Sequence, residues 1–305
     1  MKRKVIQIAN STQLVSLPRK WSQKYGVKKG DEIDVNENKN TLVISTERVK
    51  IVNELKVDVS GLLPRLVDRF LARSYQKGYD RITIIFDSHE QLITIRNKVK
   101  ELLGFEVMDI SNSVCSIQSI SSKLEIDFEP VLRKAFIAVL DMADTCLDAY
   151  EKSDKEVLEN FYHKDFDVNK FCYFCLRHIN KEMSGDFGTY ILYYLVEMLE
   201  DVGDSYKELA THLRETSPKK DIGKMLKGAN KVFRTGYDFF YNPTISKANE
   251  AMKDYKEILI NIRNNYKRLE DDADLIALSI IEQILRQVYH FCTMRLDTLK
   301  ELEGK

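Results

Sequence analysis

The first thirty residues concentrate the side chains that could do chemistry, and that chemistry is the binding of phosphate groups. They contain eight lysines and arginines and no acidic residue, whereas the whole chain balances 47 basic against 47 acidic side chains. Contacts between ammonium or guanidinium groups and nucleic-acid phosphates give affinity without sequence specificity. We therefore predict that this segment binds double-stranded DNA, through Lys2, Arg3, Lys4, Arg19, Lys20 and Lys24.

Short strands and one short helix must position these cations. Residues 4–10 (KVIQIAN) and 41–46 (TLVIST) have strand patterns, Pro18 suits the first position of a helix, and Gly26 suits its end. About 47 residues of this kind expose too much apolar surface to fold well alone. We therefore expect a homodimer in which a second copy completes the core.

This segment also resembles a known family. Residues 11–20 (STQLVSLPRK) and 26–31 (GVKKGD) resemble the AbrB/MazE/SpoVT swapped-hairpin DNA-binding fold. The resemblance implies an N-terminal swapped-hairpin β domain that dimerises and binds DNA. Two arginine positions of AbrB fall here on Ser22 and Gln23, so the resemblance does not by itself imply a sequence preference.

Charge and hydropathy place this segment within a larger protein. Residues 1–50 carry eleven basic and five acidic side chains, a balance of +6, so residues 51–305 balance to −6. DNA would therefore meet one end of the molecule. No run approaches eighteen apolar residues, and the start of the chain is too polar for a signal peptide. We expect a soluble, cytoplasmic protein without membrane insertion.

Five cysteines are scattered along the chain, which fits a reducing compartment. Cys172 and Cys175 form a CxxC pair with His178 three residues on, but no second CxxC or HxxxH follows. The pair lies in an apolar helical pattern, where thiols serve as small hydrophobic groups. Core packing is thus favoured over metal or redox chemistry.

Residues 51–124 predict a small α/β module of order βαβαββ. Its strands are expected at 54–59, 81–86, 105–110 and 114–120, and its helices at 62–77 and 88–103. It contains no GxGxxG, no P-loop and no nucleophile motif. A spacer or dimer-organising role is favoured, with a small-ligand pocket as the alternative.

Residues 125–302 are almost entirely helical in pattern. Apolar residues recur at spacings of three and four, in three helices, a break at residues 217–220, and three more helices. The fold class predicted is therefore multidomain: an AbrB-like β domain at 1–50, the α/β linker domain at 51–124, and three-helix bundles at 125–216 and 217–305.

The first bundle carries a second resemblance. Residues 199–204 (LEDVGD) look like the PhoU signature LERIGD, and residues 169–177 (NKFCYFCLR) look like an archaeal PhoU pattern. An AbrB-like domain ahead of a PhoU-like one is typical of archaeal phosphate uptake regulators. The resemblance implies a DNA-binding transcriptional regulator of phosphate uptake. Its helical bundles would sense phosphate status or dock on a partner. The alternative is a PhoU-type cytoplasmic adaptor on a phosphate transporter or signalling kinase, without direct DNA regulation. An antitoxin-like role fits the long helical remainder poorly.

The PhoU resemblance also implies a metal site. Glu200 with Asp204, and Asp165 with Asn169, stand four residues apart and so share a helix face. Their oxygens could hold a divalent or iron-type metal, although Asn169 supplies no charge. A solvated or salt-bridged acidic face is the favoured interpretation, and no cofactor is required.

The second bundle departs further from that pattern. Its equivalent pairs are Glu257 with Asn261 and Glu282 with Arg286, and an arginine repels a cation. A second metal cluster is not expected. No arrangement of the five dispersed histidines with a nucleophile argues for catalysis, so we predict a protein that is not an enzyme.

Overall fold

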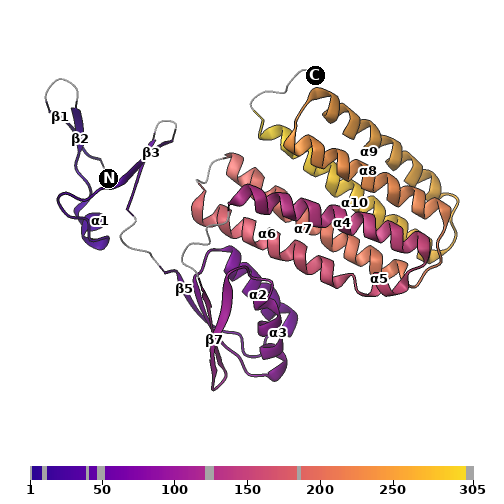
Figure 1. Ribbon diagram of the computed structural model, residues 1–305, viewed down its shortest axis with the longest axis horizontal. Helices are drawn as coiled ribbons and strands as arrows, with labels where there is room; N and C mark the ends of the chain where they lie inside the picture. The colour runs from indigo at the N-terminus through magenta and orange to yellow at the C-terminus, as the bar shows by residue number, and fades with distance from the viewer. Residues whose placement is uncertain are drawn as a thin grey trace. The chain divides into compact units, whose positions relative to one another are not determined.

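A computed structural model gives the fold of the chain (Figure 1). It describes residues 2–8, 12–38, 41–46, 52–120, 127–183 and 187–299. Contacts divide the chain into two compact units, Met1–Val52 and Asn53–Lys305, and each unit is described by itself.

The described residues of the N-terminal unit form two separate antiparallel hairpins and a short helix. Strands β1 (Val5–Ile8) and β2 (Thr12–Val15) form the first hairpin, and β3 (Asp34–Asn38) and β4 (Thr41–Ser45) form the second. Helix α1 (Arg19–Lys24) lies between them in sequence. A small strand-containing region is therefore present, as expected. The swapped-hairpin arrangement needs a second chain and stays a prediction.

No described side chain of this unit is buried. Val5 is 59% exposed and its neighbour Ile6 is 57% exposed. Consecutive side chains of a strand point to opposite faces, so both faces of the first hairpin are open. Val35, Leu42 and Val43 of the second hairpin are also exposed. An isolated two-stranded hairpin is marginally stable at best, so a single copy lacks a core here.

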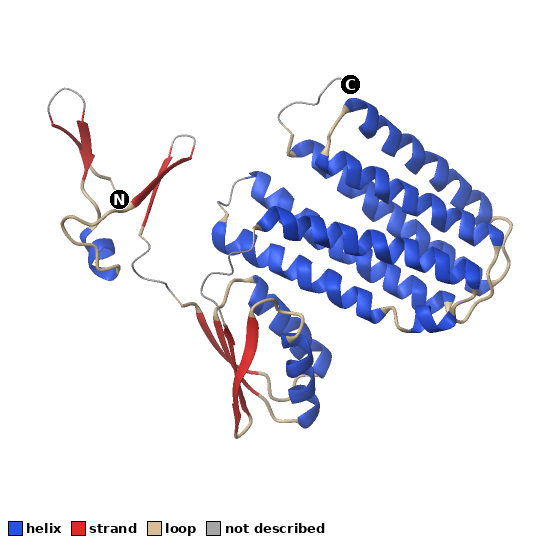
Figure 2. Cartoon of the chain, viewed as in Figure 1, coloured by secondary structure: helices blue, strands red, loops and turns tan. Residues whose placement is uncertain are grey.

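The second unit begins with the α/β module, whose elements follow the predicted order. They are β5 (Glu54–Asp58), α2 (Pro64–Gln76), β6 (Arg81–Ile85), α3 (His89–Val99), β7 (Phe105–Ser111) and β8 (Val114–Ser119). The sheet order is β5-β6-β8-β7, in which β5 is parallel to β6 and the other pairs are antiparallel. Helices α2 and α3 lie along one face of the sheet (Figure 2). The second helix was predicted to reach residue 103 but ends at Val99.

The described residues from 127 onward form seven helices, which share one hydrophobic core. They are α4 (Phe128–Lys152), α5 (Lys155–Glu159), α6 (Tyr162–Glu182), α7 (Phe187–Leu213), α8 (Lys220–Tyr241), α9 (Ile245–Tyr266) and α10 (Asp272–Asp297). The helix expected from residue 155 to 181 is broken at residues 160–161 into α5 and α6. The Phe136 ring lies 5.0 Å from that of Phe240 and 5.1 Å from that of Phe291, so the two predicted bundles meet in common packing.

The helices of the described ranges do not meet the requirements of a bilayer. A membrane span needs about 20 consecutive, predominantly apolar residues. Every described helix is too short or too polar to cross the hydrocarbon core.

Candidate functional site

The four predicted metal-binding residues come together where α6 and α7 pack. Asn169 Nδ2 donates to Asp165 Oδ2 over 3.3 Å, one helical turn apart on α6. Lys207 of α7 donates from Nζ to that same oxygen at 2.7 Å and also to Asp204 Oδ1. The ammonium thus bridges an acid of each helix. The acidic face is therefore salt-bridged across the two helices.

Glu200 lies on the buried side of the same cluster and is 5% exposed. The hydroxyl of Tyr173 donates to Glu200 Oε1 over 3.3 Å. Burial, and then the nearby carboxylate of Asp204, raise the pKa of Glu200 to about 7. This carboxyl group therefore exchanges its proton near neutral pH.

The positions of the oxygens in this cluster decide whether a metal ion fits. Asp165 Oδ1 and Asn169 Oδ1 are buried and accept no hydrogen bond from the described part of the chain. Those two atoms could ligate a hard cation. However, the ammonium of Lys207 already supplies the positive charge, and no three acidic, cysteine or histidine side chains in the described ranges converge on one point. In this arrangement the set does not fit a metal, and the metal site stays a prediction.

The corresponding pairs of the second bundle lie on α9 and α10. Arg286 Nε donates to Glu282 Oε1 at 2.9 Å, which closes that helix face with an ion pair. Glu257 is exposed on α9, four residues from Asn261. A cation at Glu282 would be repelled by the guanidinium group of Arg286. The two residues form a salt bridge on the surface of α10.

A second constellation joins the α/β module to the helices. The buried guanidinium of Arg177 on α6 donates to the main-chain oxygens of Tyr75 at 2.9 Å and Tyr79 at 2.7 Å, and to Asp80 Oδ1 at 2.6 Å. Its central carbon lies 4.9 Å from the ring centres of Tyr75 and Phe105. The C-terminal end of α2 is thus capped by a side chain of another helix.

Neighbouring contacts extend this junction. Arg73 of α2 and Glu197 of α7 form a two-pronged ion pair, with Nη2 to Oε2 at 2.9 Å. Lys181 Nζ reaches Asp80 Oδ1 at 2.6 Å. Gly78 has a φ of +93°, and a Cβ there would lie 2.7 Å from Lys181 Cγ. Only glycine meets both demands at the turn where α2 reaches α6.

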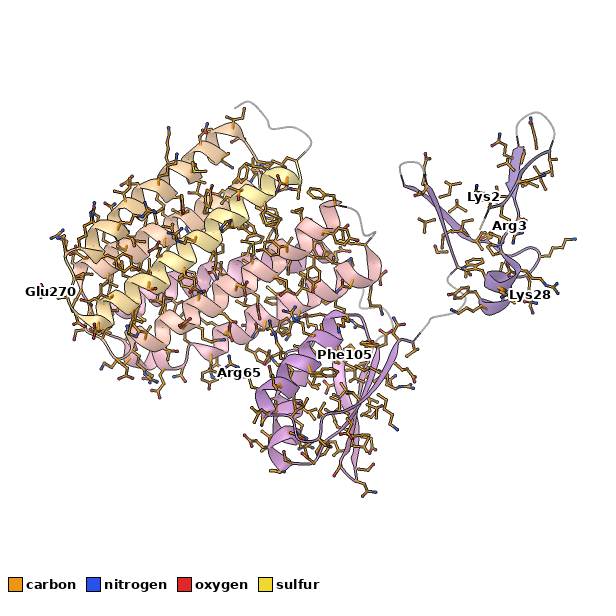
Figure 3. The ribbon with its side chains drawn as sticks, turned by 180° about the vertical axis from the view of Figure 1, so that it is seen from behind. Lys2, Arg3, Lys28, Arg65, Phe105 and Glu270 are labelled. Atoms are coloured by element: carbon orange, nitrogen blue, oxygen red, sulfur yellow. The ribbon has the colours of Figure 1, made fainter. Side chains whose placement is uncertain are left out.

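The predicted DNA-binding residues all lie on the N-terminal unit. All six are exposed, and within the described ranges none of them forms an ion pair. Figure 3 labels Lys2 and Arg3 near β1 and Lys28 near α1. The charge is therefore free to meet an external anion.

The cysteine pair belongs to the core. Cys172 and Cys175 are buried in α6, and burial raises the pKa of both thiols, with further contributions from nearby acids. The His178 ring lies 5.4 Å from that of Phe128. A buried, protonated thiol is a poor nucleophile, so the pair acts in packing.

The sequence did not identify two residues that organise these sites. Lys207 follows Asp204 by three residues, a spacing that predicts a local ion pair but not the bond to Asp165. Arg177 ends the segment that resembles PhoU, but its partners lie about a hundred residues earlier in the chain. Neither contact has a signal in the local sequence.

Comparison with known proteins gave a structural likeness. No family model matches the chain, and no curated protein matches it. The crystal structure of the phosphate transport system regulatory protein PhoU from Streptococcus pneumoniae aligns with a TM-score of 0.45 and 17% identity. The alignment covers 58% of this chain and 98% of that one. At that identity and TM-score, the match gives no information about ligand, partner or activity.

Proposed function

We propose that this protein is a non-enzymatic regulator of phosphate transport that works as a homodimer. The homodimer is supported by the lack of a hydrophobic core in the described part of the N-terminal unit. Its described strands expose apolar side chains on both faces, and none of its described side chains is buried. Burying such a surface against a second copy is favourable by roughly 25 cal/mol per Å².

The phosphate link is supported by the sequence resemblance to PhoU in α6 and α7. Residues 169–177 and 199–204, which carry it, belong to helices that pack together, and Tyr173 of the first bonds Glu200 of the second. Protonation of the Glu200 carboxyl group would change the charge between α6 and α7, and so the packing of these two helices. The signal itself is inferred by analogy with the family.

Docking on a transporter or signalling kinase is the first candidate for the output of this regulator. Phe187, Tyr190 and Tyr194 are each more than half exposed along α7. Aromatic side chains are enriched at protein interfaces, which favours a protein partner for the helical unit. A pull-down from cells grown at high and low phosphate tests this output. Recovery of a transporter or kinase complex by the wild type, and its loss in a variant with these three residues changed to serine, is the expected result.

DNA binding is the second candidate, and the six exposed cations of the N-terminal unit favour it. Electrophoretic shifts at graded salt test it, with Arg3, Lys4, Arg19 and Lys20 changed together to glutamine. The slope of log affinity against log salt should fall by about 0.9 for each phosphate that the variant no longer neutralises.

The matched control for that experiment changes Lys224, Lys227, Lys253 and Lys256 to glutamine. These lysines are exposed on α8 and α9 and form no ion pair within the described ranges. The control removes the same charge and should bind as the wild type does. An affinity for DNA that does not depend on salt concentration, or that falls equally in both variants, would rule out binding through these cations. Chromatin immunoprecipitation under phosphate limitation then identifies target sites.

A further inference from the structure

A cavity of about 640 Å³ lies between the α/β module and the helices. It is lined by the C-terminal half of α3, the loop that follows it, β7 and Lys170 of α6. Cavities of about 300–1,000 Å³ are typical of small-molecule sites. Phe105, labelled in Figure 3, forms part of its wall on the side of the module that faces the helices.

Three basic side chains line this cavity, and among the described residues they have no acidic partner. Arg96 and Lys100 stand one turn apart at the end of α3, and Lys170 is half-buried in α6. Within the described ranges none of the three forms an ion pair, and Lys100 Nζ donates to the neutral amide of Asn97 at 3.3 Å. By contrast, the buried Lys98 in the same helix bonds Glu101 at 2.6 Å and Asp68 at 3.2 Å. The cations at the cavity are therefore left for an external anion.

A structural role explains only part of this charge. Cations near a helix C-terminus are stabilised by the helix dipole, which accounts for Arg96 and Lys100. It does not account for Lys170, which lies mid-helix in α6 and brings a third positive charge to the same wall. Clefts lined by one sign of charge concentrate the opposite ion.

The rest of the wall indicates the kind of anion. Glu106 is the acidic residue among the described lining residues, so the wall carries a net charge of +2. A phosphomonoester carries about −1.5 to −2 at pH 7, whereas a carboxylate carries −1. The remaining wall includes the apolar side chains of Ile93 and Ile120, which are exposed, and of Leu103 and Val107, which are half-buried. We propose that this cavity binds a phosphomonoester with an apolar or aromatic body. The proposal does not depend on the function proposed above.

Isothermal titration calorimetry of the full chain with 1-naphthyl phosphate tests the proposal. This probe combines a phosphate dianion with an apolar ring system. The expected result is one site per chain with a dissociation constant at or below about 1 mM, a value within reach of a ligand of this size. Inorganic phosphate, 1-naphthol and 1-naphthoate each lack part of that chemistry and should bind at least tenfold more weakly.

The variants R96Q, K100Q and K170Q locate the binding site. Each removes one charge from an exposed or half-buried position, so the fold is retained, and circular dichroism checks this. Each should raise the dissociation constant of 1-naphthyl phosphate about tenfold, as expected for the loss of one charge-assisted hydrogen bond. A control that changes Lys224, Lys227 and Lys253 to glutamine removes three charges from α8 and α9, as many as the three variants remove together, and should bind as the wild type does.

Four results would overturn the proposal. The first is no heat from 1-naphthyl phosphate at 5 mM, a concentration well above the expected dissociation constant. The second is equal weakening by the control set, which would mean diffuse surface charge. The third is inorganic phosphate or 1-naphthol binding as tightly as the full probe, since one half of the wall would then contribute nothing. The fourth is equal binding of 1-naphthoate, which would remove the preference for a phosphate.

Discussion

Arg177 fixes the α/β module to the helices, and its replacement by methionine provides a direct test of that junction. Methionine keeps much of the length and apolar contact of arginine but has no donor. The change removes the bonds to the oxygens of Tyr75 and Tyr79 and to Asp80. The arginine side chain is only 9% exposed, so little water can replace those bonds.

The size of the effect follows from these contacts. Removing one partner of a buried, hydrogen-bonded ion pair costs about 3–5 kcal/mol. Asp80 keeps its bond from Lys181 at 2.6 Å, which holds the cost within that range. A unit of about 250 residues loses about 2–4 °C in Tm per kcal/mol. We therefore expect Arg177→Met to lower the Tm of the Asn53–Lys305 unit by about 6–20 °C.

Differential scanning calorimetry of the full chain measures this shift. Lys181→Met is the matched control, because it removes a cation from the same carboxylate but leaves the cap on α2 intact. Its side chain is 27% exposed, so its loss should cost about 1 kcal/mol or less. A Tm within 2 °C of wild type for Arg177→Met, or equal losses in the two variants, would show that the junction does not depend on this cap.

Three further predictions concern the acidic cluster and the N-terminal unit. Lys207→Gln should lower stability by about 1–3 kcal/mol, less than for a fully buried pair because Lys207 is partly exposed. Mn²⁺ should leave the Tm of the wild type unchanged in thermal melts; a wild-type response would refute the role of the ammonium as counterion. Glu200 has a folded pKa of about 7 against its usual 4.5, so the folded state binds the proton more tightly. As the pH rises from 4.5 to 7, the wild type should therefore lose stability relative to Glu200→Gln, by about 3 kcal/mol at most. Free energies of unfolding in urea that change equally with pH in the two proteins would contradict this. Lys in place of both Ile6 and Val43, which are exposed on β1 and β4, should convert a dimer to a monomer in light scattering. An unchanged mass would place the dimer contact elsewhere.

Local patterns were sufficient to predict most of the secondary structure. The alternation in residues 54–59 and 81–86 and the spacing of three and four in the helices reflect which face each element buries, and this is a property of neighbouring residues. Some helix ends differ from the prediction, because the break at residues 160–161 and the end of α3 at Val99 depend on packing and turn geometry. The exposed cations of the N-terminal unit were also evident from composition.

The sequence by itself determined the order of elements, the basic N-terminal segment and the one-turn spacing of the acids on α6 and α7. Tertiary structure alone decided how those charges are used. Lys207 reaches Asp165 across 42 residues of sequence, Arg177 reaches Tyr75 across 102, and Lys170 joins Arg96 at one cavity wall. The physical reason is that electrostatic energy depends on distance and burial in space, and neither is encoded in the spacing of residues along a single helix.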